Sequence, residues 1–334
     1  MDTLEHEKEI QEYVKSIEHL KKQNKKTEHF CSEIKRLEKK LQELKKNVYS
    51  KLTPWERIQI CRHPKRPHAI DYIKNLCGNS FLELCGDRNF RDDRALIGGI
   101  GFIDQMKCVV LGQEKGCDTE SRIHHNFGMM HPEGYRKALR LMKLAEKFHL
   151  PVITFLDTPG AYPCLEAEER GQGWAIAQNL LEMARLKTPI IVVVIGEGCS
   201  GGALGIGVGD SVGMLEHAYY SVITPEGCAS ILWKDPSKRI DAASALKLNA
   251  EHLHSFNIID TIIKEPLGGA HHNPQETFSN VKHFVLEQWQ KLKMIPTQIL
   301  TEQRYQKYRE LGAVDCESRH LQESSKINHI SFGG

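Results

Sequence analysis

The chain has 334 residues, of which 40% are hydrophobic, and 45 Lys and Arg against 43 Asp and Glu give a net charge of +2. This composition is typical of a globular protein and excludes collagen and extended disorder. The longest strongly apolar run, residues 190–195, is far shorter than the roughly 18 residues that cross a bilayer, so we expect no transmembrane helix. The first residues, MDTLEHEKEI, lack the basic and apolar regions of a secretory signal, which favours a cytoplasmic location.

Residues 1–51 differ from the rest of the chain and are expected to form a helical extension. Their apolar residues recur at steps of three and four, with a break near residues 21–26: Ile10, Val14, Ile17, then Ile34, Leu37, Leu41, Leu44 and Val48. This pattern predicts a helical hairpin or two short coiled-coil segments. Its lysine clusters also suggest nucleic-acid binding, but interleaved acidic residues make a solvated helix face the better interpretation. These apolar residues form a seam along the helices, and it must be buried against the rest of the chain or against another subunit.

Residues 52–312 alternate strands and helices and are expected to form one domain. Strands are predicted at 96–103, 107–113, 151–157, 189–196, 211–216, 218–223 and 258–263, and helices at 134–148, 168–186, 201–208, 237–248 and 274–292. Continuous apolar strands separated by helices indicate a largely parallel sheet that is covered on both faces, which is an α/β fold. Residues 313–334 are expected to be a mobile tail.

Glycines gather where two of these strands end. Residues 157–163, DTPGAYP, follow one strand, and residues 196–203, GEGCSGGA, follow the next strand and run into an apolar helix. Open α/β sheets place ligands at the carboxyl ends of their strands. The amides of Gly201, Gly202 and Ala203 would be unpaired donors at a helix start, suited to an oxygen that becomes negative during reaction. Alternatively, the glycines only allow the strand and helix to pack tightly.

The same segment matches a competing motif. Gly198-x-Ser200-x-Gly202 fits the nucleophile elbow of serine hydrolases, and Asp260 followed by His271 would supply the rest of a triad in the required order. The pattern spans only five positions in a glycine-rich region, so it has a high false-positive rate. A serine hydrolase therefore stays as the alternative function.

Two further loops could line a pocket. Residues 124–135, which include Phe127 and Gly128, form a polar, glycine-bearing connection, and residues 224–230 begin a helix with Pro225 and Glu226 in its first turn. Each also has a plain structural interpretation, as a connector and as a helix start with a favourable charge. The ten cysteines contain no C-x-x-C pair, and the adjacent histidine pairs are poorly spaced for one metal, so we expect no metal in this chain.

Taken in order, eight strings of this sequence resemble the carboxyltransferase alpha subunit of the multi-subunit acetyl-CoA carboxylase of bacteria and plastids. They are ALIGGI, GQEKG, NFGMMHPEGYRKALRLM, ITFLDTPGAYP, AEERGQ, VIGEGCSGGALGIGVGD, TPEGCASILWK and EPLGGAHHNP. The resemblance implies a crotonase-like fold, a ββα superhelix, with the helical hairpin as an N-terminal extension. It also implies transfer of a carboxyl group from carboxybiotin to acetyl-CoA, which gives malonyl-CoA for fatty-acid synthesis.

The resemblance further implies partners. They are a carboxyltransferase beta subunit that carries a zinc ribbon, in an α2β2 assembly, a biotin carboxyl carrier protein that bears the carboxybiotin, and biotin carboxylase. The chain would be active only with the beta subunit, and no membrane is implied.

The family's paired glycines at the helix start correspond to Gly201 and Gly202, and these are the expected catalytic residues, whose amides hold the biotin oxygen. The expected cofactor-binding residues are Gly160, Ala161, Tyr162, Gly198, Ser200, Phe127, Gly128, Pro225 and Glu226. Biotin itself then acts as the base, so that Ser200 is a turn residue and not a nucleophile. The sequence departs from the family at Cys164 and Cys199, where glycine is expected, which leaves the backbone geometry beside the anion site open.

Overall fold

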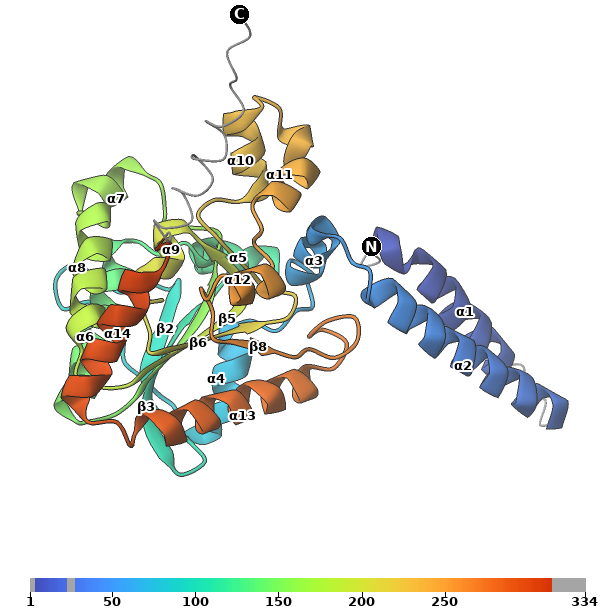
Figure 1. Ribbon diagram of the computed structural model, residues 1–334, viewed down its shortest axis with the longest axis horizontal. Coiled ribbons are helices and arrows are strands. Elements are labelled where there is room, and N and C mark those ends of the chain that lie inside the picture. The colour runs from blue at the N-terminus through green and yellow to red at the C-terminus, as the bar shows by residue number, and fades with distance from the viewer. Residues whose placement is uncertain (1–3, 23–27, 314–334) are drawn as a thin grey trace, which may run out of the picture.

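The protein, seen here as a computed structural model, is described over residues 4–22 and 28–313. Figure 1 shows a layered body from which two long helices project, α1 (Lys8–Lys22) and α2 (Glu28–Tyr49), preceded by the short turn η1 (Glu5–Glu7). The predicted helical hairpin is therefore present. The division into extension, body and tail stays a prediction, and the tail beyond Ala313 lies outside the described residues.

A mixed sheet forms the centre of the body. Within the described residues its eight strands are β1 (Leu82–Glu83), β2 (Leu96–Ile103), β3 (Met106–Gln113), β4 (Val152–Thr158), β5 (Ile190–Cys199), β6 (Ser211–Leu215), β7 (Tyr219–Ser221) and β8 (Thr261–Ile263). The order is β1-β2-β3-β4-β5-β6-β8, and β7 pairs with the end of β5. β1 to β3 are antiparallel and the pairs from β3 to β8 are parallel, as the sequence predicts for most of the sheet.

Helices cover both faces of this sheet. They are α3 (Pro54–Cys61), α4 (Ala69–Cys77), α5 (Thr119–His124), α6 (Pro132–Lys147), α7 (Leu165–Glu169), α8 (Gln172–Arg185), α9 (Ser200–Leu204), α10 (Pro225–Leu232), α11 (Arg239–Ala245), α12 (Ala250–Ser255), α13 (Pro274–Leu292) and α14 (Thr297–Glu310), with 3₁₀ turns η2 (Gly78–Ser80), η3 (Asn126–Gly128) and η4 (Pro236–Lys238). In Figure 1, α6, α8 and α14 lie on one side, and α4 and α13 on the other. Every residue of β4 and β5 is consequently buried, which explains their continuous apolar sequence.

Most predicted elements are found, and the differences have local causes. The bounds of β2 and α13 are as predicted. The helix expected at 168–186 is instead two helices, because Gly171 adopts a left-handed conformation with φ of 81° between α7 and α8. The helix expected at 201–208 ends at Leu204, and β5 runs three residues further, to Cys199. The strand end and the helix start thus meet without a loop between them.

The apolar seam of the hairpin is covered by its own two helices together with Leu52 and α3. Ile10 from α1 packs in one cluster with Tyr49, Leu52 and Ile60, and the partly buried residues around it are Leu4, Val14, Leu41, Leu44 and Val48. The phenol of Tyr49 donates a 2.7 Å hydrogen bond to Glu7, which ties the start of the hairpin to its end. Lys21 pairs with Glu38 across the two helices at 2.8 Å, so this lysine faces its neighbour helix.

A buried ion pair fastens the segment before α4 to the end of β8. The guanidinium of Arg66 donates two bonds, of 2.7 and 2.9 Å, to the carboxylate of Glu265. That carboxylate also accepts from the amides of His217 and Ala270 at 2.9 and 2.7 Å. Burial opposes ionisation of Glu265, but Arg66 and His217 together outweigh burial and lower the pKa of the carboxyl to about 2.

This pair predicts a pH-dependent contribution to stability. Glu265→Gln should lower the free energy of unfolding by about 1.5 to 3 kcal/mol at pH 7, because a charge-assisted bond is lost. Since the folded pKa lies below the ordinary value of 4.5, the difference between wild type and variant should be full above pH 4.5 and shrink as the pH falls towards 2. Urea unfolding at several pH values measures it. A difference that stays constant between pH 7 and pH 3 would contradict this assignment.

Candidate active site

The first part of the site is the junction of β5 and α9. Ser200, the first residue of α9, is exposed and has a left-handed φ of 57°, so the chain turns sharply from strand to helix. Gly201 is half-buried and Gly202 is buried. Amides in the first turn of a helix have no acceptor within that helix. Among the described residues, neither a side chain nor a loop carbonyl accepts from the amides of Gly201 and Gly202, and these donors suit an anionic oxygen.

A second turn, at the end of β4, lies against the first. Gly160 has a φ of 150°, and the hydroxyl of Thr158 both accepts from its amide at 3.1 Å and donates to its carbonyl at 2.7 Å. A Cβ at Gly202 would overlap the backbone of Gly160 and Ala161. Glycine is therefore required at 202 for the two turns to touch. The structure brings Gly160, Ala161, Ser200, Gly201 and Gly202 together, as expected.

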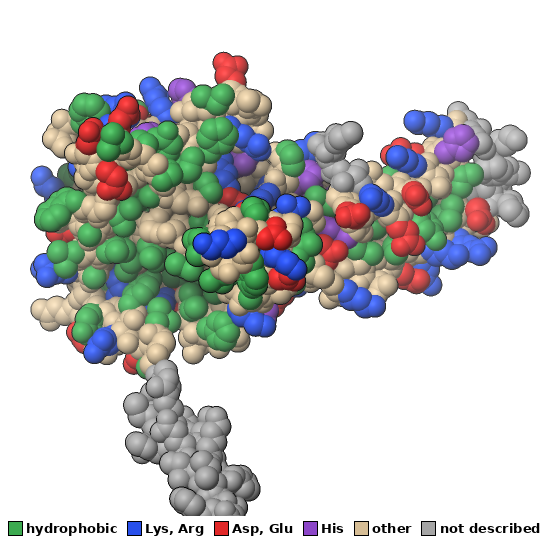
Figure 2. Space-filling view, turned by 90° about the horizontal axis from the view of Figure 1, so that it is seen from above, with side chains coloured by type: hydrophobic (Ala, Val, Ile, Leu, Met, Phe, Trp, Pro, Cys, Tyr) green, Lys and Arg blue, Asp and Glu red, His purple; other side chains and the backbone are tan. Residues whose placement is uncertain are grey.

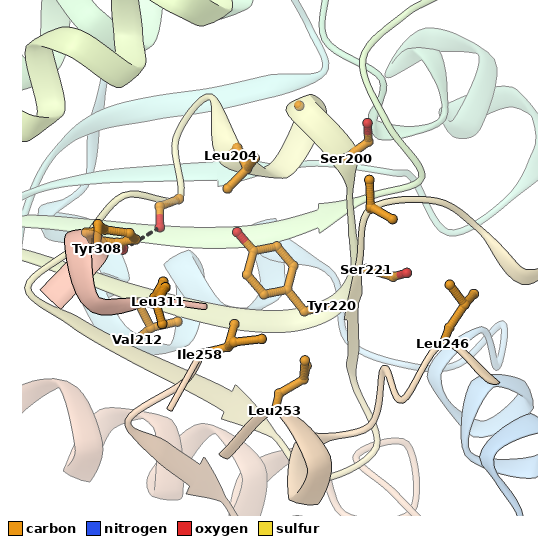
Figure 3. Close-up of a pocket in the computed structure, with 13 residues that line it drawn as sticks. Ser200, Leu204, Val212, Tyr220, Ser221, Leu246, Leu253, Ile258, Tyr308 and Leu311 are labelled. Atoms are coloured by element: carbon orange, nitrogen blue, oxygen red, sulfur yellow. Dashed lines mark hydrogen bonds between the residues drawn. The ribbon is translucent and has the colours of Figure 1, made fainter. Parts of the chain in front are cut away.

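An apolar cavity of about 400 Å³ opens beside this junction. Figure 3 shows Ser200 at its rim and the ring of Tyr220 between Leu204 and Ile258. It is lined by Ser200, Gly201, Leu204, Gly207, Val212, Tyr220, Ser221, Val222, Leu246, Leu253, Ile258, Tyr308 and Leu311. A hollow with apolar walls that reaches Ser200 and Gly201 at the helix start suits a ligand with an apolar body and a polar head.

A cluster of buried charges lies at the carboxyl ends of β3, β4 and β5. The ammonium of Lys115 is 2.9 Å from Asp157 and 3.0 Å from Glu197. Arg62 also pairs with Glu197 and, at 2.6 Å, with Glu226. Burial would raise the pKa of Asp157 and of Glu197, but Lys115, together with His68 at Asp157 and Arg62 at Glu197, outweighs burial and lowers the pKa of both carboxyls. The cluster stays ionised and braces three strand ends.

The sequence interpretation missed this cluster. A signal was present, because Lys115, Asp157 and Glu197 each follow or end a strand whose carboxyl end faces the same edge of the sheet. A smaller hollow of about 270 Å³ adjoins the cluster, lined by Cys61, Arg62, His63, His68, Lys115, Arg122, Phe127, Asp157, Pro159 and Glu197.

Among the other expected cofactor-binding residues, Phe127 lines a hollow, whereas Gly128, Gly198 and Tyr162 line neither of the two. Phe127, with a φ of 54°, lines the smaller one, and Gly128 packs against Lys115 and the carbonyl of Asp157. Gly198 lies within β5 beside Tyr220. The amide of Tyr162 donates to the carbonyl of Met130 at 3.1 Å.

The start of α10 holds the last two expected residues. Pro225 is its buried first residue, and the carboxylate of Glu226 is held by Arg62. Glu226 is therefore engaged by the charge cluster, and its expected role in cofactor binding stays a prediction.

The two unusual cysteines leave the backbone undisturbed. Cys164 and Cys199 have φ values of −128° and −113°, which any residue adopts, so glycine is not needed at either position. The thiol of Cys199 donates to the hydroxyl of Tyr219 at 3.6 Å, and burial raises its pKa to about 12. It is a buried neutral side chain beneath the turn.

The serine hydrolase alternative fails on geometry. Asp260 accepts from the amide of Val212 at 2.7 Å and pairs with Lys307. His271 stacks on His63 with ring centroids 3.8 Å apart. In the described part of the chain, neither Asp260 nor His271 contacts the other or Ser200, because each is engaged at a different place in the fold. The predicted order of residues was correct for a triad, but the triad is not assembled.

One group of side chains has the composition of a metal site. Glu7, His271 and His272 place one ligand atom each within 4.8 Å of one another. The carboxylate of Glu7 already accepts from Tyr49 and lies 3.6 Å from His272, so these residues join the hairpin to the body. The group is remote from the α9 junction and belongs to the packing of the hairpin.

Comparison with known proteins decides the family. Residues 3–312 match the family described as acetyl co-enzyme A carboxylase carboxyltransferase-like. The acetyl-coenzyme A carboxylase carboxyl transferase subunit alpha of Protochlamydia amoebophila is 67% identical over 312 residues, which are 93% of this chain and 98% of that protein. The chain belongs to the acetyl-CoA carboxylase carboxyltransferase alpha-subunit family. The subunit of the same name from Chlamydia pneumoniae is 61% identical, covering 95% of this chain and 98% of the other.

Solved structures show the same fold at low identity. Transcarboxylase 12S, with methylmalonyl-coenzyme A and methylmalonic acid bound, matches with a TM-score of 0.55 at 16% identity, over 68% of this chain. The chain spans only 43% of the length of that protein. A chain of the Pseudomonas malonate decarboxylase hetero-tetramer, in complex with coenzyme A, matches with a TM-score of 0.56 at 14% identity, over 77% and 97% of the two chains. The crotonase-like fold is confirmed. In the described residues, no helix is long and apolar enough to span a membrane.

Proposed function

We propose that this chain is the alpha half of an acetyl-CoA carboxylase carboxyltransferase, which moves a carboxyl group from carboxybiotin to acetyl-CoA and forms malonyl-CoA for fatty-acid synthesis. The observation that carries the proposal is the pair of glycine turns at the α9 start, with donor amides that open beside an apolar cavity. Family membership supplies the reaction class. A cytoplasmic location is part of the same proposal.

The residues at the junction fit a biotin head group. Bound carboxybiotin supplies the carboxyl group, and its loss leaves negative charge on the ureido oxygen. The amides of Gly201 and Gly202 would hold that oxygen with dipoles that are already oriented, which stabilises the charge most where water is excluded. The apolar wall formed by Leu204, Tyr220 and Ile258 would hold the ring system and exclude water. No side-chain nucleophile takes part.

The exposed rim of the site supports a partner subunit. Figure 1 places α7, α9, α10 and α11 along one edge of the body, and Figure 2, viewed from that side, shows apolar side chains gathered across it. Strongly exposed apolar residues of this region include Leu165, Val222, Ile231 and Leu232, which are 66% to 75% exposed. Such a patch is typical of a protein interface. A zinc-ribbon beta subunit would cover it in an α2β2 assembly, served by the biotin carboxyl carrier protein and biotin carboxylase.

Reconstitution tests the proposal. The purified chain should show no malonyl-CoA-dependent carboxylation of free biotin until a beta subunit is added, since the acyl-CoA thioester oxygen needs a second anion site. Coupled decarboxylation of malonyl-CoA measures this, with the beta subunit alone as the control. Full activity of the isolated chain, or none in the assembled complex, would reject it.

Replacing Ser200 tests whether this exposed serine is only a turn residue or acts as a nucleophile. Ser200→Ala should keep kcat of the assembled enzyme within about threefold, whereas loss of a covalent nucleophile abolishes turnover. Wild-type chain should also resist labelling by a fluorophosphonate. Labelling of Ser200 together with loss of activity in the variant would contradict a role limited to the turn.

A further inference from the structure

Three buried polar side chains donate to carbonyls of α9 and of Gly205, the residue that follows it, from inside the body. Gln113, at the end of β3, donates from Nε2 to the carbonyl of Gly202 at 2.7 Å. Tyr135, from α6, donates its hydroxyl to the same oxygen at 3.3 Å. Asn179, from α8, donates to the carbonyl of Gly205 at 2.8 Å. All three are at most 1% exposed, so these bonds are shielded from water.

These bonds matter because α9 is too short to hold itself in place. It has five residues, and a single turn of helix is unstable without tertiary contacts. Its orientation is therefore set by the groups that contact it. In a planar trans peptide the carbonyl and the amide point in opposite directions, so fixing the carbonyl of Gly202 also fixes the amide of Ala203 and the turn that contains Gly201 and Gly202.

The same side chains connect the turn to the other strand end. The Oε1 atom of Gln113 accepts from the amide of Asp157 at 3.2 Å, so one side chain links the end of β4 to α9. Asn179 also donates to the carbonyl of Tyr135 at 2.9 Å, and a Cβ at Gly205 would overlap the Tyr135 ring. The carbonyl of Gly202 thus receives two donors that are themselves held rigidly.

We propose that Gln113 and Tyr135 are positioning residues for carboxyl transfer, which clamp the Gly202 carbonyl and keep the amides of the α9 turn directed at the oxygen that becomes negative. The inference rests on the proposed function of this turn and adds to it the residues that orient the donors. Loss of the clamp leaves a buried carbonyl short of donors and lets the turn rotate. A misplaced donor stabilises the transition state less, and this loss is larger than the loss in binding of the substrate.

The test compares kcat, KM and stability in the assembled alpha–beta complex. Gln113→Leu should lower kcat about 10- to 100-fold with KM for malonyl-CoA changed less than about twofold. Tyr135→Phe removes the hydroxyl that makes the longer of the two bonds to the Gly202 carbonyl. It should lower kcat about 3- to 10-fold, again with KM for malonyl-CoA changed less than about twofold. Thr188→Val is the matched control, since the buried hydroxyl of Thr188 donates to the carbonyl of Leu150 at 2.6 Å, away from α9. It should lower Tm and leave kcat unchanged.

The possible outcomes distinguish failure of the positioning role from failure of the proposed function. If the wild-type complex is inactive, the proposed function fails, and that failure is seen before any variant is made. If the wild type is active and Gln113→Leu lowers Tm but keeps kcat at the level of Thr188→Val, the positioning role is overturned and the proposed function stands. If Gln113→Leu does not fold, Tyr135→Phe is the remaining test. An unchanged kcat in that variant then overturns the positioning role.

Discussion

Gly201→Pro is expected to lower kcat of the assembled carboxyltransferase about 10²- to 10³-fold, the effect of removing one donor from an oxyanion site. Proline has no amide hydrogen, and it is tolerated in the first turn of a helix, where that hydrogen has no helical acceptor. Gly201 is the second residue of α9, so the substitution deletes the donor within the first turn, where a helix accepts proline. Turnover of malonyl-CoA in the presence of biotin measures the loss.

Gly201→Ala is the matched control because it keeps the amide. A Cβ at this position would lie 3.7 Å from Ile176, an ordinary contact, so the fold has room for it. We expect the alanine variant to retain much more activity than the proline variant, and both to assemble with the beta subunit. If the two variants lose activity equally, the side chain and not the missing amide is responsible, and Gly201 is not a donor.

Lys115→Met is expected to lower the free energy of unfolding by about 3 to 5 kcal/mol, the cost of removing one partner from a buried group of ion pairs. The ammonium of Lys115 is the shared counter-ion of Asp157 and Glu197, both about 4% exposed. Methionine retains the length of the side chain but removes its charge. The two carboxylates would then repel each other at the ends of β4 and β5. Urea unfolding at pH 7 measures the change.

A surface lysine provides the comparison for that variant. Lys264 pairs with Glu216 at 3.0 Å, but its side chain is 72% exposed, and exposed pairs of this kind contribute about 0 to 1 kcal/mol. Lys264→Met should therefore leave stability almost unchanged. Equal effects at Lys115 and Lys264 would mean that the buried cluster does not brace the strand ends.

Sequence patterns were sufficient for the long elements and for a largely parallel sheet. β4, β5 and α13 are long enough to show their pattern, and all were predicted close to their observed bounds. Short elements such as α3 and α12 carry too few residues for a period to appear. The break between α7 and α8 depends on the left-handed conformation of Gly171, and glycine is permissive there without being diagnostic.

Some features of the site could also be predicted from the sequence, and others could not. The junction glycines Gly201 and Gly202 could be singled out from the sequence pattern, but their role comes from the family resemblance and stays a prediction. The clamp by Gln113 and Tyr135 could not be derived, because each acts on a residue more than 40 positions away in the chain. The serine hydrolase alternative was wrong for a related reason. A five-residue pattern does not say whether Asp260 and His271 lie near Ser200 in space.

The most direct test of the central claim is a structure of the assembled alpha–beta complex with biotin bound. The ureido oxygen of biotin should lie about 2.7 to 3.1 Å from the amide nitrogens of Gly201 and Gly202, with the ring system in the cavity beside Tyr220. A ureido oxygen bound elsewhere, with these two amides capped by carbonyls of the beta subunit, would contradict the account.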